Sequence, residues 1–191
     1  KVMKCDPPRY EREGGEFYPI ERLAEECDIL SFHTPLDPTT HHLLNKSLLK
    51  HLRPDAVILN ASRGGVVDNI AVANSSHRYH FDVWENEPNI TPIVLEKSVI
   101  ATPHVAGYSA QGKANATAMV INQIADYFNL PLTTWYPEDA PRSCAQLISW
   151  EEMCITIDKY YPTSEESDRP KHHPEHLEAM RNNYLYREEY F

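Results

Sequence analysis

The chain has 191 residues and a formal net charge of −10 at pH 7, which argues against a nucleic-acid-binding protein because such proteins carry a basic patch. An anionic substrate stays possible, since one well-placed arginine outweighs the global charge locally. No apolar run approaches the roughly 20 residues that cross a bilayer, and no signal peptide is visible. We therefore expect a cytoplasmic protein with no membrane partner and no nucleic-acid partner.

Cysteine usage points to a reducing compartment. The cysteines are scattered and form no CxxC pair: Cys5, Cys27, Cys144 and Cys154. Free thiols are the simplest interpretation, and a disulfide or a metal-binding set is the alternative.

Short apolar runs alternate with helical patterns over the first two-thirds of the chain. These patterns predict strands at 2–5, 29–33, 56–62, 79–84 and 98–102, and helices at 19–27, 45–51 and about 109–128. Pro7-Pro8 is expected to stop the first strand at Asp6, and Asn45 to cap the second helix. The apolar run AVILNAS predicts a strand buried on both faces.

Strand, helix, strand, helix in succession indicates βαβ units, and hence an α/β fold with a Rossmann-like, doubly wound parallel sheet. In such sheets, ligands bind beyond the carboxyl ends of the strands. Position alone therefore selects the residues that follow the strands: Asp6, Thr34, Arg63, Asp82 to Glu87, and His104.

The chain changes character after about Asn129. LPLTTWYPEDAPR is proline-rich and predicts a connection, while the pattern at 148–161 favours a strand or a helix without deciding between them. From Pro162 the tail is polar and charged, with one amphipathic helix expected around 174–185.

Arg63 follows a predicted buried strand and precedes two glycines, which let the backbone approach a ligand closely. Its planar guanidinium suits a substrate carboxylate and the adjacent oxygen, because it binds two oxygens at once. A surface ion pair is the alternative interpretation.

Glu87 and His104 follow the next two predicted strands. Oxidation of a secondary alcohol needs a base for the hydroxyl proton, and histidine suits that role because its ordinary pKa is about 6.5. A neighbouring carboxylate would fix the tautomer of the imidazole. A structural histidine is the alternative, but Arg, Glu and His at three successive strand ends favour a catalytic set.

Other polar residues carry weaker signals. Asp6 could bind the ribose of a dinucleotide or simply form a turn, and Arg9 leaves NADP open. Thr34 could touch a cofactor or belong to a structural turn. The remaining histidines, including HHPEH at 172–176, lack the spacing of a helical metal-binding pair, so we expect no metal site.

The strings FHTPL, LRPDAVILNASRGGVVD, FDVWENEP and ATPHVAGYS, within residues 29–112, resemble the D-2-hydroxyacid dehydrogenase family. The resemblance implies an NAD-dependent enzyme in which Arg63 orients the substrate and His104 is the acid–base. Glu87 would be the partner of His104, with Glu85 as the competing carboxylate. The implied NAD contacts are Asp6, Thr34, Ala61, Ser62, Arg63, Asp82 and Gly107.

The same resemblance divides the chain into a partial NAD-binding domain (1–108), a long helix that returns to the substrate domain (109–130) and a C-terminal dimerisation domain (131–191). A narrower group within the family is similar in CDPPR, HVAGYSAQGKANAT and HPEHLEAMRNNYLYREE. That similarity implies oxidation of 4-phospho-D-erythronate to 2-oxo-3-hydroxy-4-phosphobutanoate in pyridoxal phosphate biosynthesis.

The narrower resemblance also implies which partners this protein binds. These are a small anionic phosphorylated hydroxy acid, contacted by Tyr108, and a second copy of the chain in a homodimer. No cationic pocket for the phosphate is evident in the sequence, so we expect the phosphate ligands upstream of Lys1.

Two features depart from the family pattern. The G-x-G-x-x-G loop that binds the pyrophosphate is not found in this sequence, and we expect it upstream of Lys1. Between Asp68 and Asp82 the chain is several residues shorter than the helix and strand of the family. This predicts further residues near Ser75–His77 in the natural protein, and an intact mass of 22.0 kDa would contradict the prediction.

Two alternatives stay open. One is a D-2-hydroxyacid dehydrogenase that acts on phosphoglycerate or glyoxylate, against which the tail argues. The other is a non-catalytic NAD-sensing binding module on the same fold, although nothing in the sequence resembles a partner-binding surface.

Overall fold

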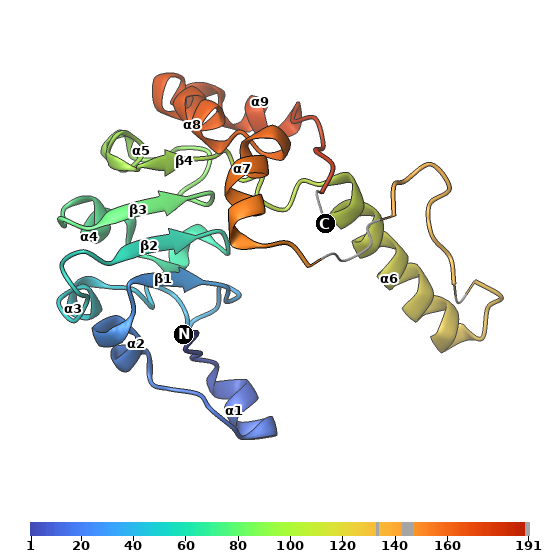
Figure 1. Cartoon of the computed structure of the whole chain (residues 1–191), viewed down its shortest axis with the longest axis horizontal. Helices are drawn as coiled ribbons and strands as arrows, with labels where there is room; N and C mark the ends of the chain where they lie inside the picture. Colours follow the sequence, from blue (N-terminus) through green and yellow to red (C-terminus); the bar gives the residue numbers. More distant parts are fainter. Residues whose placement is uncertain (133, 143–146, 190–191) are drawn as a thin grey trace.

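A parallel sheet of four strands forms the centre of the computed structural model, which describes residues 1–132, 134–142 and 147–189. The strands are β1 (Ile29–Phe32), β2 (Val57–Asn60), β3 (Arg78–Phe81) and β4 (Ile100–Ala101). Each strand pairs in parallel with the next one along the chain (Figure 1). The predicted α/β fold with a parallel sheet is confirmed, although the strands are shorter than expected.

A helix lies between each pair of successive strands, as βαβ units require. These helices are α3 (Lys46–Leu49), α4 (Asn69–Ala73) and α5 (Pro92–Lys97). The expected cap of α3 is present, because Asn45 Oδ1 accepts hydrogen bonds from Ser47 N at 2.9 Å and Leu48 N at 3.0 Å. The expected helix α2 (Ile20–Glu26) precedes β1 and buries Leu23 and Ala24.

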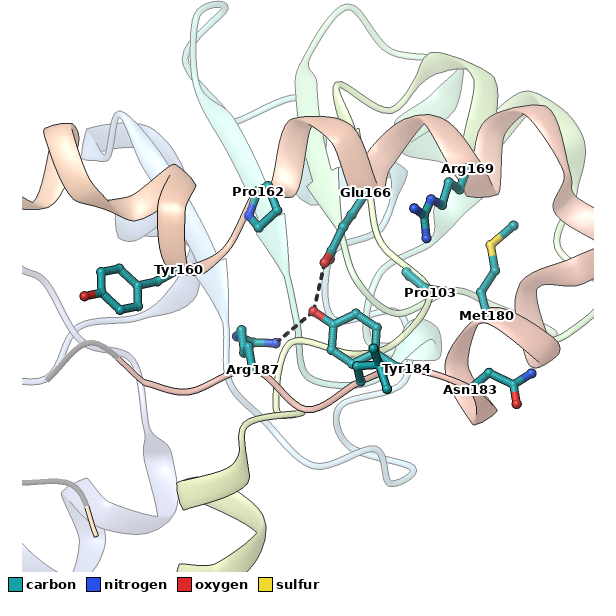
Figure 2. A pocket seen from close by; sticks show the side chains of 10 residues that line it. Pro103, Tyr160, Pro162, Glu166, Arg169, Met180, Asn183, Tyr184 and Arg187 are labelled. Atoms are coloured by element: carbon teal, nitrogen blue, oxygen red, sulfur yellow. Dashed lines mark hydrogen bonds between the residues drawn. The ribbon is translucent and has the colours of Figure 1, made fainter. Parts of the chain in front are cut away.

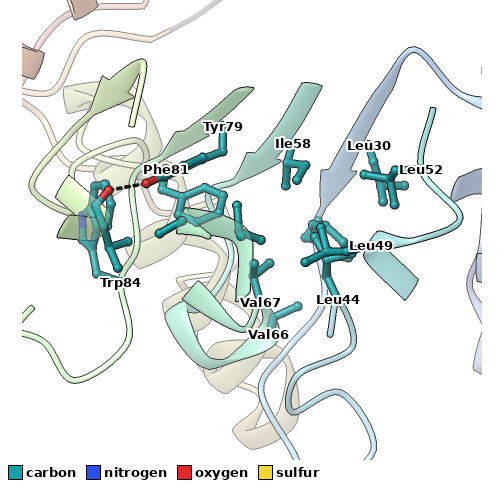
Figure 3. Close-up of a cluster of buried hydrophobic side chains, with 14 of the residues drawn as sticks. Leu30, Leu44, Leu49, Leu52, Ile58, Val66, Val67, Tyr79, Phe81 and Trp84 are labelled. Atoms are coloured by element: carbon teal, nitrogen blue, oxygen red, sulfur yellow. Dashed lines mark hydrogen bonds between the residues drawn. The ribbon is translucent and has the colours of Figure 1, made fainter. Parts of the chain in front are cut away.

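One face of the sheet carries the hydrophobic core (Figure 3). In β2, Ile58 and Asn60 are buried while Val57 and Leu59 are half-buried. The prediction that this strand is buried on both faces is therefore wrong. The described core residues gather on one face, where Leu30, Phe32, Ile58, Tyr79 and Phe81 alternate with more exposed neighbours.

The first residues differ from the prediction. Residues 1–6 form no strand, and Pro7-Pro8 begins a helix, α1 (Pro7–Glu13). Proline suits the first turn of a helix, where the backbone N–H groups have no intrahelical partner. Asp6 caps α1, since its Oδ1 accepts a hydrogen bond from Arg9 N at 3.0 Å.

The connection between β2 and β3 is short. Helix α4 has five residues, and the chain reaches β3 through Asn74 to His77. His77 Nδ1 is buried there without a hydrogen-bond partner among the described residues. The expectation of further residues near Ser75–His77 stays a prediction.

The long helix is confirmed as α6 (Ala110–Phe128), which begins after its N-cap Ser109. The segment at 148–161 is a helix, α7 (Trp150–Tyr160). The tail holds more helix than expected: α8 (Thr163–His172), the 3-10 turn η2 (Pro174–His176) and α9 (Leu177–Asn182).

Helices α8 and α9 lie beside β4, while α6 extends away from the sheet (Figure 1). Ala101 N of β4 donates a hydrogen bond to Ser167 Oγ at 2.8 Å, and Leu177 joins the hydrophobic core. The tail therefore shares the core of the sheet. Its dimerisation role stays a prediction.

Two expectations concern the chain as a whole. Cys5, Cys27 and Cys154 are free thiols, and Cys144 lies outside the described residues. Within the described ranges, no helix combines the length and the apolar composition needed to cross a membrane.

Candidate active site

His104 and Glu87 form a hydrogen-bonded pair. His104 follows β4, and its Nδ1 lies 2.8 Å from Glu87 Oε2. The side chains of His104 and Glu87 are 25% and 19% exposed. The other oxygen of Glu87 accepts a hydrogen bond from Trp84 N at 2.7 Å, which fixes the carboxylate. A carboxylate on Nδ1 orients the ring and leaves Nε2 for the proton of a ligand.

Arg63 lies in the same pocket as this pair. The pocket has a volume of about 330 Å³, and its lining includes Arg63, Glu87 and His104. Arg63 is exposed, and one of its terminal nitrogens donates a hydrogen bond to Ser62 O at 2.7 Å. The structure thus brings together the three residues predicted as the catalytic set.

The turn that carries Arg63 is shaped by Asn60, which is 1% exposed. Asn60 Nδ2 donates to Arg63 O at 3.0 Å, while Oδ1 accepts hydrogen bonds from Ser62 N at 3.1 Å and Ser62 Oγ at 2.8 Å. Sequence reasoning missed this residue. The available signal was a polar side chain that ends an otherwise apolar strand.

Asp82 holds the loop that carries His104. Its carboxylate is 7% exposed and accepts three hydrogen bonds, from Thr102 Oγ1 at 2.7 Å, Val105 N at 2.8 Å and Ala106 N at 3.0 Å. These donors flank His104 on both sides. Asp82 therefore positions His104, a role that the sequence did not reveal, and its predicted contact with NAD stays a prediction.

Glu85, the competing carboxylate, is bound elsewhere. Its Oε1 lies 2.6 Å from His42 Nε2, and its Oε2 accepts a hydrogen bond from Asn69 N at 2.9 Å. With His41, these groups bring three potential metal-ligating atoms within 4.8 Å of one another. Because His42 and Glu85 already bond directly, we interpret the cluster as structural support, and the absence of a metal stays a prediction.

Backbone strain gathers at this pocket. Four described non-glycine residues have a positive φ, and two of them line the pocket: Asn86 at 60° and His104 at 60°. A third, His42 at 50°, bonds to the pocket residue Glu85. Such conformations persist only where the surroundings enforce them, and they cluster at functional sites.

Comparison with known proteins decides the family. Residues 1–106 match the model of the D-isomer specific 2-hydroxyacid dehydrogenase, NAD binding domain. The chain belongs to the D-isomer-specific 2-hydroxyacid dehydrogenase family. The family model also identifies residues 1–106 as an NAD-binding domain, which agrees with the predicted cofactor and the Rossmann-like fold.

Curated relatives extend the similarity into the tail. The chain is 39% identical over 199 aligned residues to the erythronate-4-phosphate dehydrogenase of Bacteroides thetaiotaomicron, covering 99% of this chain and 57% of the relative. It is 43% identical over 136 residues to the enzyme of the same name from Ectopseudomonas mendocina, covering 69% of this chain and 36% of that relative. The chain thus spans 57% of the length of the first relative and 36% of the length of the second.

Solved structures share the fold. An acyclic imino acid reductase in complex with NADPH and D-Arg superposes with a TM-score of 0.59 at 26% identity, covering 68% of this chain and 43% of that one. The D-mandelate dehydrogenase of Rhodotorula graminis gives a TM-score of 0.55 at 24% identity, covering 75% and 44%. At 24% identity, the second likeness shows the fold alone.

The family's cofactor fits the carboxyl edge of this sheet in part. Ala61 and Gly107 are exposed there, and a Cβ on Gly107 would meet no atom within 4 Å, so the main chain is open to a flat ring. Thr34 and Ser62 also follow strands at this edge. Asp6 does not, because it caps α1. In parallel sheets ligands bind at this edge, and the contacts of these residues with NAD stay predictions. The sequence holds no glycine-rich loop for the pyrophosphate.

Tyr108, which the sequence predicts to contact the substrate, lies where the tail meets the loop of His104. Its hydroxyl accepts a hydrogen bond from Arg181 Nε at 3.3 Å. Its ring makes an edge contact with the ring of Tyr184 at 6.0 Å between centroids.

A second pocket, of about 370 Å³, lies between the tail helices and contains none of the predicted site residues (Figure 2). There, Tyr184 Oη donates to Glu166 Oε1 at 2.9 Å. Burial raises the pKa of Glu166 above its ordinary value.

Proposed function

We propose that this protein oxidises 4-phospho-D-erythronate to 2-oxo-3-hydroxy-4-phosphobutanoate with NAD, as a step in pyridoxal phosphate biosynthesis. The observation that carries the proposal is the hydrogen bond between His104 Nδ1 and Glu87, in one pocket with Arg63. Relatives that carry the name erythronate-4-phosphate dehydrogenase, at 39% and 43% identity, support the choice of substrate.

Each residue of the set has a distinct role. Arg63 binds the C1 carboxylate of the substrate and polarises the oxygen on C2. His104 Nε2 takes the proton of the C2 hydroxyl, while Glu87 holds the opposite nitrogen and stabilises the imidazolium that forms. The hydride of C2 would pass to NAD, which would supply the hydride acceptor when bound.

The experiment that tests this function measures NADH formation by the full-length protein. We expect turnover with 4-phospho-D-erythronate and little turnover with 3-phosphoglycerate at the same concentration. Equal or faster turnover of 3-phosphoglycerate would favour another dehydrogenase of the family. Turnover of neither acid, with NAD still tightly bound, would favour the non-catalytic NAD-sensing module.

We also propose a cytoplasmic homodimer. Apolar side chains exposed along α6, including Met119, Tyr127 and Phe128, support an interface with a second subunit or domain. Light scattering of the full-length protein measures the mass in solution, and a monomer across the micromolar range would contradict the homodimer.

A further inference from the structure

The substrate of the proposed function has two anionic ends, and the catalytic set accounts for one of them. We propose that Arg181, Lys113 and Tyr108 form the site that binds the phosphate group. The inference rests on the proposed function and names its second substrate-binding site. It also revises the expectation that all phosphate ligands lie upstream of Lys1.

Arg181 reaches the catalytic pair from the tail. It stands on α9 (Leu177–Asn182), and its Nε donates to Tyr108 Oη at 3.3 Å. A terminal nitrogen lies 3.9 Å from Glu87 Oε2, the oxygen that binds His104. The carboxylate of Glu87 therefore lies between the guanidinium of Arg181 and the imidazole of His104. Because the contact between Arg181 and Glu87 is long, N–H groups of the guanidinium stay available to donate to a ligand.

Lys113 approaches the same tyrosine from the first turn of α6. Its ammonium nitrogen lies 3.9 Å from the centroid of the Tyr108 ring. Across the described ranges, no carboxylate lies within ion-pair distance of Lys113. In a chain with a net charge of −10, two weakly neutralised cations at one tyrosine side chain, Arg181 at the hydroxyl and Lys113 over the ring, indicate an anionic ligand.

The tail is held in place against the loop of the acid–base, so Arg181 is positioned before a ligand arrives. Arg187 donates hydrogen bonds to Val105 O at 3.1 Å and to Ala106 O. Ala110 N donates to Arg187 O at 2.9 Å. Three residues before Arg187, the hydroxyl of Tyr184 donates a hydrogen bond to Glu166 of α8 (Figure 2).

The arrangement matches the order of groups along the substrate. The C1 carboxylate lies next to the reacting C2 hydroxyl, and the phosphate is on C4. Arg63 shares the pocket of His104, whereas Arg181 is linked to His104 through Glu87. A 2-hydroxy acid that lacks the phosphate would leave Arg181 and Lys113 without an anion. Arg181 is therefore a residue that determines specificity.

The test compares the affinities for 4-phospho-D-erythronate and D-erythronate by calorimetry, in full-length protein saturated with NADH so that no turnover occurs. Arg181→Met should weaken binding of the phosphorylated acid about 10- to 100-fold and leave D-erythronate unchanged. Arg181→Lys should restore part of the preference. Arg169→Met, an exposed arginine of α8 that lines the second pocket, is the matched control and should change neither affinity.

Equal weakening of both ligands in Arg181→Met would overturn the inference, because it would show that Arg181 acts by positioning Glu87. If Arg181→Met fails to fold, Lys113→Met decides: a selective loss of about 2- to 5-fold for the phosphorylated acid supports the site, and no selective loss overturns it. Selective binding without turnover would refute the proposed function but keep the phosphate site. Turnover without any selective effect would refute the site alone.

Discussion

Gly64 is in direct contact with the main chain of Trp84: a Cβ on Gly64 would lie 1.9 Å from Trp84 O and 2.6 Å from Glu85 N. This contact joins the loop of Arg63 to the loop of Glu87. Any side chain at position 64 would push the two loops apart, so the approach of the arginine to the acid–base pair depends on this glycine.

Gly64→Ala should therefore destabilise the protein by about 1–3 kcal/mol or more and sharply reduce turnover. Gly65→Ala is the control, because a Cβ there would meet Leu36 Cδ2 at 3.2 Å, the flexible end of an exposed side chain. Urea unfolding and NADH formation measure both effects. Equal stability and turnover of the two variants would show that the main chain of Trp84 moves at little cost to accommodate a Cβ at position 64.

The carboxylates of Glu87 and Glu85 should have different functions, one in catalysis and the other in stability. Glu87→Gln should lower kcat about 10²-fold or more, because the imidazole loses the anion that orients it and stabilises its charged form. Glu85→Gln should act mainly on stability, by about 1 kcal/mol, since Glu85 binds His42 and Asn69. A larger loss of kcat in Glu85→Gln than in Glu87→Gln would reverse the assignment.

Asp82→Asn tests the support of the His104 loop. An amide in place of the carboxylate presents N–H donors to backbone donors, so at least one of the three hydrogen bonds is lost. We expect a destabilisation of about 2–4 kcal/mol and a lower kcat. Asp55→Asn, at an exposed ion pair with Arg53, is the control and should change stability by less than about 1 kcal/mol. If Asp82→Asn left the free energy of unfolding unchanged, Asp82 would not position the loop of His104.

Glu166 makes a pH-dependent contribution to stability. Burial raises its pKa in the folded state, and its Oε2 has no hydrogen-bond partner among the described residues. A raised folded pKa favours folding below the unfolded pKa, and this contribution is lost as the pH rises through the folded pKa.

Glu166→Gln, which keeps the neutral form at every pH, should therefore raise Tm at pH 7 by a few degrees, roughly the effect of 1 kcal/mol in a protein of this size. The gain should disappear below the ordinary pKa of a glutamate. Thermal unfolding across this range checks the sign, with the exposed Glu96→Gln as control. A gain that persists in acid would refute the linkage.

Local patterns predicted most elements of the fold. The run PIERLAEEC, the cap Asn45 and the long pattern that begins at Ser109 gave helices where the structure has them. The segment at 2–5 failed because a short apolar run before two prolines fits either a strand end or a helix start, and Asp6 caps a helix. Burial of β2 on both faces failed because an apolar run does not say how many layers cover a sheet.

The sequence selected three residues that the structure places in one pocket, but it did not reveal the contacts that support them. Residues after the strands could be selected by position, which brought out Arg63, Glu87 and His104. The supporting contacts of Asn60, Gly64 and Asp82 depend on where separate loops meet, and no local pattern encodes that. Arg181 could not be found either, because no local motif links it to Glu87, which lies 94 residues earlier in the chain; their contact appears only in the fold.

The central claim is that His104 is the acid–base of an NAD-dependent oxidation. The most direct measurement is NADH formation by the full-length protein and its His104→Asn variant at saturating 4-phospho-D-erythronate. We predict that the variant loses turnover about 10²-fold or more, while its affinity for NADH stays unchanged. Undiminished turnover in the variant would contradict the claim.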